Sequence, residues 1–180
     1  MPESQEDFCQ AFGIVSEVKY QNEGGPSLKQ CFALLRKVSS EPVIDLARLV
    51  DAVIFNYLVG NNDAHGKNFS LLYRGLGTDD PHVGLAPLYD ILSTVYYPEL
   101  SRTMAMKLGG EYSSAKVWPH NFEQLAEDAG LAKPLVTRRV AEMIEAIRAV
   151  LSQMHSDGIT RSIAARILER CELSQGRFQR

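Results

Sequence analysis

The sequence is poor in cysteine and has no long hydrophobic run, and both absences narrow the class of protein. Its 180 residues contain three cysteines, Cys9, Cys31 and Cys171, and no CxxC pair. Neither a disulfide framework nor a zinc site is indicated, and a reducing cytoplasm is the expected compartment. Because no uninterrupted stretch of about 18 apolar residues occurs, the sequence predicts no membrane-spanning helix.

The sequence also lacks an excess of positive charge. It has 22 acidic and 19 basic residues, with a formal net charge of -3. Since nucleic-acid-binding proteins usually carry a basic face, no direct nucleic-acid binding is expected. The N-terminus, residues 1–7, has acids where a signal peptide needs bases and an apolar run. We therefore expect one soluble, unexported domain over residues 1–180.

What the sequence does contain is helical periodicity. Apolar residues recur at three- and four-residue intervals, which predicts a mainly α-helical fold. The expected helices cover residues 26–38, 41–59, 122–129, 135–155 and 159–171. The 41–59 helix, with Ser40 as its cap and Pro42 in its first turn, is apolar on most sides and is expected at the centre of the domain. The polar end, residues 174–180, is expected to fray.

A short β-hairpin is expected after the central helix. Residues 69–73 and 83–88 are largely apolar, and the stretch between them is rich in glycine, aspartate and proline, which is typical of a turn. Residues 103–108 fit either a strand or an extended segment that ends at Gly109 and Gly110.

A dense polar run, residues 60–68, lies between the central helix and the first strand, at the kind of junction where sites are built. Within it, Asp63 and Asn68 have the Asp-x-x-x-x-Asn spacing of a protein-kinase catalytic loop. In such a loop the aspartate accepts the proton of the substrate hydroxyl and the asparagine binds Mg²⁺. Asp90 follows the second strand, so hairpin pairing should return it close to Asn68 as a second oxygen ligand.

The same polar run also fits ordinary turn chemistry, because asparagine and aspartate bond their own backbone after a helix that ends in glycine. His65 fits loop packing or hydrogen bonding better than metal binding, since no second histidine has the spacing of a zinc site. Lys67 fits a phosphate contact and a solvated side chain equally well. Spacing alone leaves these alternatives open.

The run Phe55–Ser70 closely resembles the catalytic loop of HipA-like kinases. Other segments that resemble the same family are residues 6–11, 19–20 with 24–26, 85–90 and 105–112. The resemblance implies a protein-kinase-like C-terminal lobe of the HipA type. The site residues it implies are Asp63 as the catalytic aspartate, Asn68 and Asp90 as Mg²⁺ ligands, and His65 and Lys67 as their neighbours in the loop, at the ATP site.

Family members transfer the γ-phosphate of ATP to protein hydroxyls, with aminoacyl-tRNA synthetases among their targets. They are typically toxins of bacterial toxin–antitoxin pairs and bind a helix-turn-helix antitoxin. The resemblance therefore implies a cytoplasmic serine/threonine kinase that uses Mg²⁺ and ATP, acts on a protein substrate and pairs with such an antitoxin.

In one respect the sequence departs from the pattern of full-length members. Those proteins carry a phosphate-binding glycine loop and a strand lysine ahead of the segment that corresponds to residues 6–11. Neither is found here, and Gly24-Gly25-Pro26 opens a helix instead of forming a phosphate cradle. We expect a fragment, a truncated paralogue or one half of a split kinase, inactive without an N-lobe polypeptide.

Two other functions fit the sequence. One is a non-catalytic interaction module, in which the lobe binds a partner and turns nothing over. The other is a small-molecule kinase of the aminoglycoside or choline type, which shares the Asp-x-x-x-x-Asn spacing. Such kinases usually have His-Gly before the aspartate, where this sequence has Asn61 and Asn62. That difference favours the protein kinase.

Overall fold

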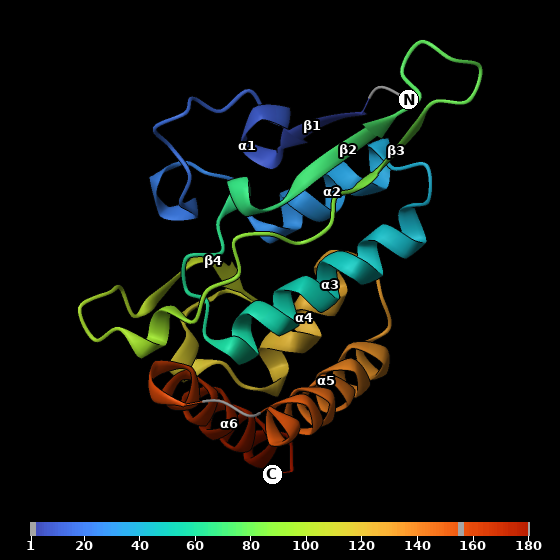
Figure 1. Ribbon diagram of the computed structural model, residues 1–180. Helices are drawn as coiled ribbons and strands as arrows, with labels where there is room; N and C mark the ends of the chain where they lie inside the picture. The colour runs from blue at the N-terminus through green and yellow to red at the C-terminus, as the bar shows by residue number, and fades with distance from the viewer. Residues whose placement is uncertain (1–2, 155–156, 180) are drawn as a thin grey trace.

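The computed structural model describes residues 3–154 and 157–179 and has a helical body with two small antiparallel sheets (Figure 1). The helices are α1 (Phe8–Ala11), α2 (Leu28–Val38), α3 (Pro42–Val59), α4 (Pro119–Ala129), α5 (Lys133–Gln153) and α6 (Gly158–Phe178). The strands are β1 (Glu3–Asp7), β2 (Ser70–Arg74), β3 (His82–Leu85), β4 (Thr103–Leu108) and β5 (Glu111–Ser113). The expectation of a mainly helical fold with a short hairpin is confirmed.

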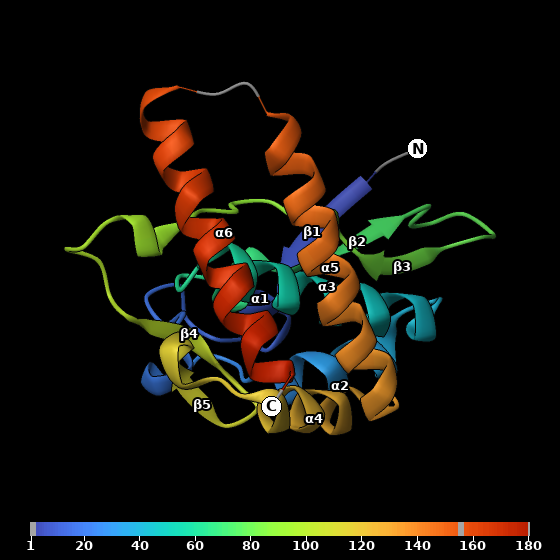
Figure 2. The same cartoon turned by 90° about the horizontal axis from the view of Figure 1, so that it is seen from below.

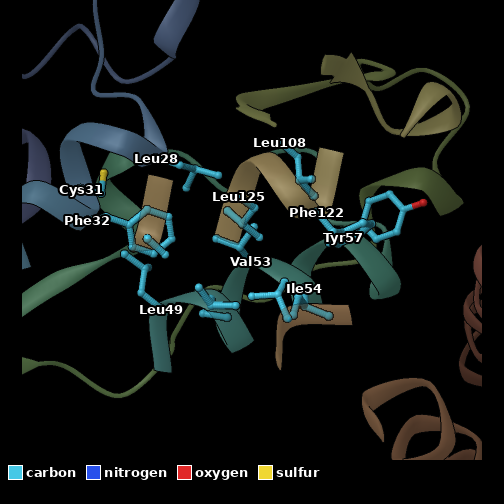
Figure 3. Packing of buried hydrophobic residues seen from close by; sticks show 14 of the residues in the cluster. Leu28, Cys31, Phe32, Leu49, Val53, Ile54, Tyr57, Leu108, Phe122 and Leu125 are labelled. Atoms are coloured by element: carbon cyan, nitrogen blue, oxygen red, sulfur yellow. The ribbon is translucent and has the colours of Figure 1, made fainter. Parts of the chain in front are cut away.

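Helix α3 lies at the centre of the domain, as its apolar sequence predicts. It contacts α2, α4, α5 and α6, which lie around it in Figures 1 and 2. Leu49 and Ile54 of α3 are fully buried in one cluster with Phe32 of α2 and Leu125 of α4 (Figure 3). Because each such side chain stabilises the fold by about 1.5–3 kcal/mol, this layer is a rigid base for the loop that follows α3.

Both ends of α3 are fixed by other segments. The helix begins at Pro42 with Glu41 as its N-cap residue, so the prediction of Ser40 as the cap is wrong. The Ser40 hydroxyl instead accepts a hydrogen bond from the Val83 amide (3.0 Å), which ties the start of the helix to β3. The helix ends at Gly60, whose φ of 78° lies in the left-handed region that favours glycine.

The polar side of α3 binds the hairpin. Asp45 is 3% exposed, and its carboxylate accepts hydrogen bonds from the Leu85 amide (2.8 Å) and the Ser39 hydroxyl (2.7 Å). Arg48 donates to the carbonyl oxygen of Leu85 (2.9 Å). These bonds hold the last residue of β3 on the helix and so fix where the chain leaves toward Asp90.

The predicted hairpin is present and carries one further strand. β2 pairs with β3, with Leu72 opposite Gly84. β1, which was not predicted, pairs with the other edge of β2, with Gln5 opposite Leu72. Its sequence has no apolar alternation, and it is held by backbone pairing and by the Tyr73 hydroxyl, which donates to Glu6 (2.7 Å). In the other sheet β4 pairs with β5, so the segment left undecided by its sequence is a strand.

The C-terminal segment is helical, and the prediction that it frays from Ser174 is wrong for the described residues. Helix α6 continues to Phe178 and lies beside α5 (Figure 2). Ser174 is buried, and the Phe178 ring packs against that of Phe122 with a centroid distance of 5.3 Å. Cys171, Ser174 and Phe178 continue the three- and four-residue spacing of a helix face through a polar sequence.

Two predicted features fall partly on positions that the structure does not describe. They are the end of the 135–155 helix, at His155, and the end of the tail, at Arg180. Among the described residues, no helix is long and apolar enough to cross a membrane.

Candidate active site

The loop after α3 is organised around the side chain of Asn61, which is 5% exposed. Its amide nitrogen donates to Asn56 Oδ1 in the last turn of α3 (2.8 Å) and to the carbonyl oxygen of Asp90 (3.4 Å). Its amide oxygen accepts the backbone N–H of Asp63 (3.2 Å). One buried amide therefore joins the end of the central helix, the predicted catalytic aspartate and the segment that carries Asp90.

The carboxylate of Asp63 is partly open to solvent, with 38% of its side chain exposed. The Tyr20 hydroxyl donates a hydrogen bond to Oδ1 (2.7 Å). Lys19 Nζ lies 3.9 Å from Oδ2, and His65 Nε2 lies 4.0 Å from the same oxygen. A carboxylate that accepts a hydrogen bond from one hydroxyl can accept one from a substrate hydroxyl, which is the contact that a general base requires.

Tyr20 and Lys19 come from the segment between α1 and α2. A tight turn holds them, because the Gly25 amide donates to the Tyr20 carbonyl oxygen (2.8 Å) and a side chain at position 25 would collide with the Lys19 backbone. Burial, and then the hydrogen bond to Asp63, raise the pKa of the Tyr20 hydroxyl, which remains a donor at neutral pH. Burial, and then Lys19, lower the pKa of His65, so its imidazole is mainly neutral at pH 7.

Asn68 and Asp90 form the second half of the site. Asn68 ends a short 3₁₀ turn (Gly66–Asn68), and its amide nitrogen donates to Asp90 Oδ2 (2.6 Å). The Tyr89 and Ser70 hydroxyl groups share a hydrogen bond (2.6 Å), which holds the returning chain beside the start of β2. The structure thus brings Asn68 and Asp90 together, as the hairpin topology predicts.

His65 and Lys67, the predicted ATP-site residues, have different surroundings. His65 is 6% exposed, and its ring packs edge-on against Tyr20 with a centroid distance of 5.7 Å, as loop packing predicts. Lys67 Nζ donates to the carbonyl oxygen of Ser16. These contacts do not test ATP binding, so the roles of both residues there stay predictions.

The Asn68–Asp90 pair offers the oxygen ligands that Mg²⁺ binds, an exposed carboxylate and an amide oxygen. In the described orientation, the side-chain amide oxygen of Asn68 accepts a hydrogen bond from the backbone N–H of His65 (2.9 Å), and the amide nitrogen faces Asp90. The amide would have to turn over to present its oxygen to a metal. Among the described residues, no group of three or more His, Cys, Asp or Glu side chains could hold a metal ion.

A cavity of about 380 Å³ lies beside Asp63. Tyr20 and Asn62 line it together with the chain between residues 92 and 105, which extends away from the body before it returns to β4 (Figure 1). Because Met104 and two leucines of that chain also line it, the cavity has an apolar part as well as a carboxylate. It gives a molecule of moderate size access to Asp63.

Sequence spacing did not assign Tyr20, Lys19 or Asn61 to the site. No periodic rule links position 20 to position 63, and an asparagine after a helix is common in turns. The one local signal is the Gly24-Gly25 pair, since a turn that needs glycine fixes the residues packed against it.

The fold and the site together define a helical domain in which the loop after α3 carries Asp63 and Asn68, and the hairpin returns Asp90 to Asn68. Residues 3–154 match the family model described as the HipA-like C-terminal domain. The chain belongs to this HipA-like family.

Its relatives include proteins named as kinases. One is a protein of Sinorhizobium fredii (strain NBRC 101917 / NGR234) that is named as a kinase, Y4mE. It is 48% identical over 153 residues, which cover 85% of this chain and 35% of Y4mE. The serine/threonine-protein kinase toxin HipA of Shewanella oneidensis is 25% identical over 186 residues, which cover 92% of this chain and 42% of the toxin.

A solved structure of HipA from Shewanella oneidensis MR-1, in complex with HipB and operator DNA, shares the fold. Its TM-score is 0.80 at 24% identity, and the match covers 99% of this chain and 45% of that chain. The 180 residues thus span between about a third and a half of the length of these relatives.

Proposed function

We propose that this chain is the catalytic lobe of a HipA-like serine/threonine kinase, which transfers the γ-phosphate of ATP to a protein hydroxyl. One arrangement carries the proposal: Asp63 borders a cavity and accepts a bond from a hydroxyl, while Asn68 and Asp90 are in contact at 2.6 Å. The names of the relatives, among them a serine/threonine-protein kinase toxin, support it.

In this proposal Asp63 orients the acceptor hydroxyl and takes up its proton as the new oxygen–phosphorus bond forms. The Tyr20 hydroxyl on Oδ1 and Lys19 near Oδ2 restrict the orientations of the carboxylate. Because phosphoryl transfer depends mainly on the positions of the reacting groups, a carboxylate held in one orientation gives a higher rate than a freely rotating one.

Asn68 and Asp90 would hold Mg²⁺, which would neutralise negative charge on the phosphates of ATP. Asn61 hydrogen-bonds to the backbone N–H of Asp63 and to the carbonyl oxygen of Asp90, and so fixes their positions relative to each other. ATP contacts by His65 and Lys67 belong to the same proposal.

The proposed biological role is that of a toxin in a toxin–antitoxin pair in the cytoplasm, with a protein substrate and a helix-turn-helix antitoxin as partners. The Shewanella oneidensis structure, in which HipA is bound to HipB and operator DNA, supports an antitoxin partner. The net charge of -3 favours contact with DNA through that partner and not directly.

A non-catalytic interaction module is the second candidate, and one observation favours it. Five large apolar side chains between β3 and β4 are 39–51% exposed. They are Leu88, Ile91, Leu92, Tyr97 and Leu100. A protein partner that covers this segment would bury them, with or without catalysis.

The test starts from the 180-residue polypeptide alone. A kinase holds its nucleotide between two lobes, and no glycine-rich phosphate loop is predicted within this sequence. Calorimetric titration with Mg²⁺ and ATP should give a dissociation constant in the high-micromolar range or weaker, and labelled ATP should give no phosphotransfer. Fusion of the N-terminal part of a HipA relative ahead of Gln5, or its addition in trans, should restore transfer.

Asp63→Ala should abolish that restored transfer, whereas the matched change Asp80→Ala, at the exposed tip of the hairpin, should not. Robust transfer by the polypeptide alone would refute the need for a second lobe. Failure of the complemented protein to transfer phosphate, with ATP bound, would favour the interaction module.

A further inference from the structure

An arginine of the C-terminal helix lies against the start of the loop that carries Asp63. Arg170 of α6 donates a hydrogen bond from Nη2 to the carbonyl oxygen of Tyr57 (2.6 Å), and its guanidinium group lies over the Tyr57 ring, 5.4 Å from the centroid. Tyr57 belongs to the last turn of α3, where backbone carbonyl groups lack regular intrahelical partners and the helix dipole favours a cation. Arg170 therefore ties α6 to the end of the central helix.

Gly60, the first residue after α3, is enclosed between α6 and the short 3₁₀ turn Thr94–Tyr96. A Cβ atom at position 60 would lie 3.1 Å from Arg170 Nε and 2.3 Å from a methyl carbon of Val95. The Gly60 carbonyl oxygen also accepts a hydrogen bond from the Val95 N–H (3.2 Å). Asp63 follows three residues later, so the position of α6 bears directly on the backbone that leads to Asp63.

The surroundings of Arg170 favour a role other than stabilisation of the fold. Its Nε is buried without a hydrogen-bond partner, and within residues 3–154 and 157–179 no carboxylate forms an ion pair with this side chain. Burial, the largest cause, lowers the pKa of the Arg170 guanidinium, which stays charged at neutral pH. A cation taken out of water without a carboxylate partner contributes little to stability, and an apolar side chain of similar length can often replace it. What an apolar side chain cannot supply is the hydrogen bond to the end of α3.

We propose that Arg170 positions Asp63 for phosphoryl transfer by fixing the end of α3 and Gly60. The proposal rests on the kinase function proposed above. Arg170 is not among the residues that line the cavity beside Asp63, so it acts through the backbone and not by contact with a substrate. Because the rate depends on the positions of the reacting groups, loss of this contact should lower kcat. KM for ATP should change little, since the proposed metal ligands, Asn68 and Asp90, bind each other and not α6.

The first test measures the 180-residue polypeptide without any assumption about activity. Arg170→Met removes the charge and the donors but keeps a long, unbranched side chain. Arg166→Met is the matched control, because Arg166 lies on the exposed side of α6 and pairs with Glu169 at the surface (2.8 Å). Both variants should denature at nearly the same urea concentration. Amide hydrogen exchange in residues 60–63 should be about tenfold faster in Arg170→Met alone, because these amides donate within the segment that the change loosens.

The second test uses the same variants complemented with the N-terminal part of a HipA relative, with labelled ATP, Mg²⁺ and a generic protein acceptor. Arg170→Met should lower kcat by about tenfold or more, while KM for ATP stays within about twofold of the parent. Arg170→Lys, which keeps the cation and a donor, should recover part of that loss. Arg166→Met should match the parent.

The outcomes separate this inference from the kinase function. If the parent transfers phosphate and Arg170→Met matches Arg166→Met in exchange and in kcat, the positioning role is refuted and the kinase function stands. A rise in KM for ATP at unchanged kcat, or an Arg170→Met chain that no longer folds, also refutes the positioning role. If exchange in residues 60–63 rises but neither parent nor variants transfer phosphate, the kinase function fails and the catalytic role of Arg170 fails with it, whereas the contact between α6 and the loop is supported.

Discussion

Replacement of Asn61 by alanine is expected to destabilise the fold and loosen the site together. The change removes bonds to Asn56, to the Asp63 amide and to the Asp90 carbonyl oxygen, and it leaves the buried Asn56 oxygen without that donor. A hydrogen bond contributes about 0.5–1.5 kcal/mol net, and the bond to Asp90, at 3.4 Å, lies at the weak end. The expected loss is therefore about 2 kcal/mol, or about 4–8 °C in Tm for a domain of this size.

Urea denaturation of the 180-residue polypeptide measures this loss without any assumption about activity. Asn22→Ala is the matched control, since Asn22 is exposed and the same change there should stay within about 0.5 kcal/mol of the parent. In the complemented enzyme, Asn61→Ala should also lower kcat by more than KM for ATP rises, because it acts on the position of Asp63. A stability indistinguishable from that of Asn22→Ala would show that Asn61 does not join these segments.

Three further outcomes are expected. Tyr20→Phe removes the hydroxyl bound to Asp63 and should lower kcat of the complemented enzyme by about tenfold, the effect of a charge-assisted hydrogen bond; an unchanged kcat would remove Tyr20 from the site. Phe178→Ala should lower the free energy of unfolding by about 2 kcal/mol, less than for a fully buried ring, whereas a frayed tail would give no change. Burial, and then the bond to Glu6, raise the pKa of Tyr73 to about 12, so stability from the protonated phenol is complete below pH about 10 and is lost as the pH rises toward 12. Glu6→Gln should lower that pKa in an ultraviolet titration of the phenol, and no shift would argue against the β1–β2 contact.

Local patterns explain the features that the sequence did predict. Helix α3 follows from a largely apolar stretch that ends at Gly60, and the hairpin follows from two apolar stretches around a turn-rich tip. The contact between Asn68 and Asp90 follows from the topology of that hairpin, because antiparallel strands return the chain to its starting edge. The Asp-x-x-x-x-Asn motif and the hairpin topology together therefore predict the contact between Asn68 and Asp90, which are 22 positions apart.

The features that the sequence did not predict depend on contacts without a periodic signal. β1 is polar and is stabilised by backbone pairing to β2, which any sequence can provide at an edge. The contact between Tyr20 and Asp63 spans 43 positions and depends on how the α1–α2 segment packs on the catalytic loop. The end of α6 was missed because arginine, glutamine and serine outnumber the apolar residues there, although Phe178 continues the buried face.

The backbone of Asp90 shows how the site is held before any ligand binds. Its φ of 55° is left-handed, which costs a residue other than glycine of order 1 kcal/mol or more, so its neighbours must impose it. Asn68 binds its side chain and Asn61 binds its carbonyl oxygen, and both partners are buried in the loop after α3. The side chain and the backbone carbonyl group of Asp90 are both held, so the carboxylate keeps one position. It accepts a hydrogen bond from the Asn68 amide at the place where a cation would bind. Binding of a metal by both residues would require the Asn68 amide to turn over, so that its oxygen replaces its nitrogen beside Asp90.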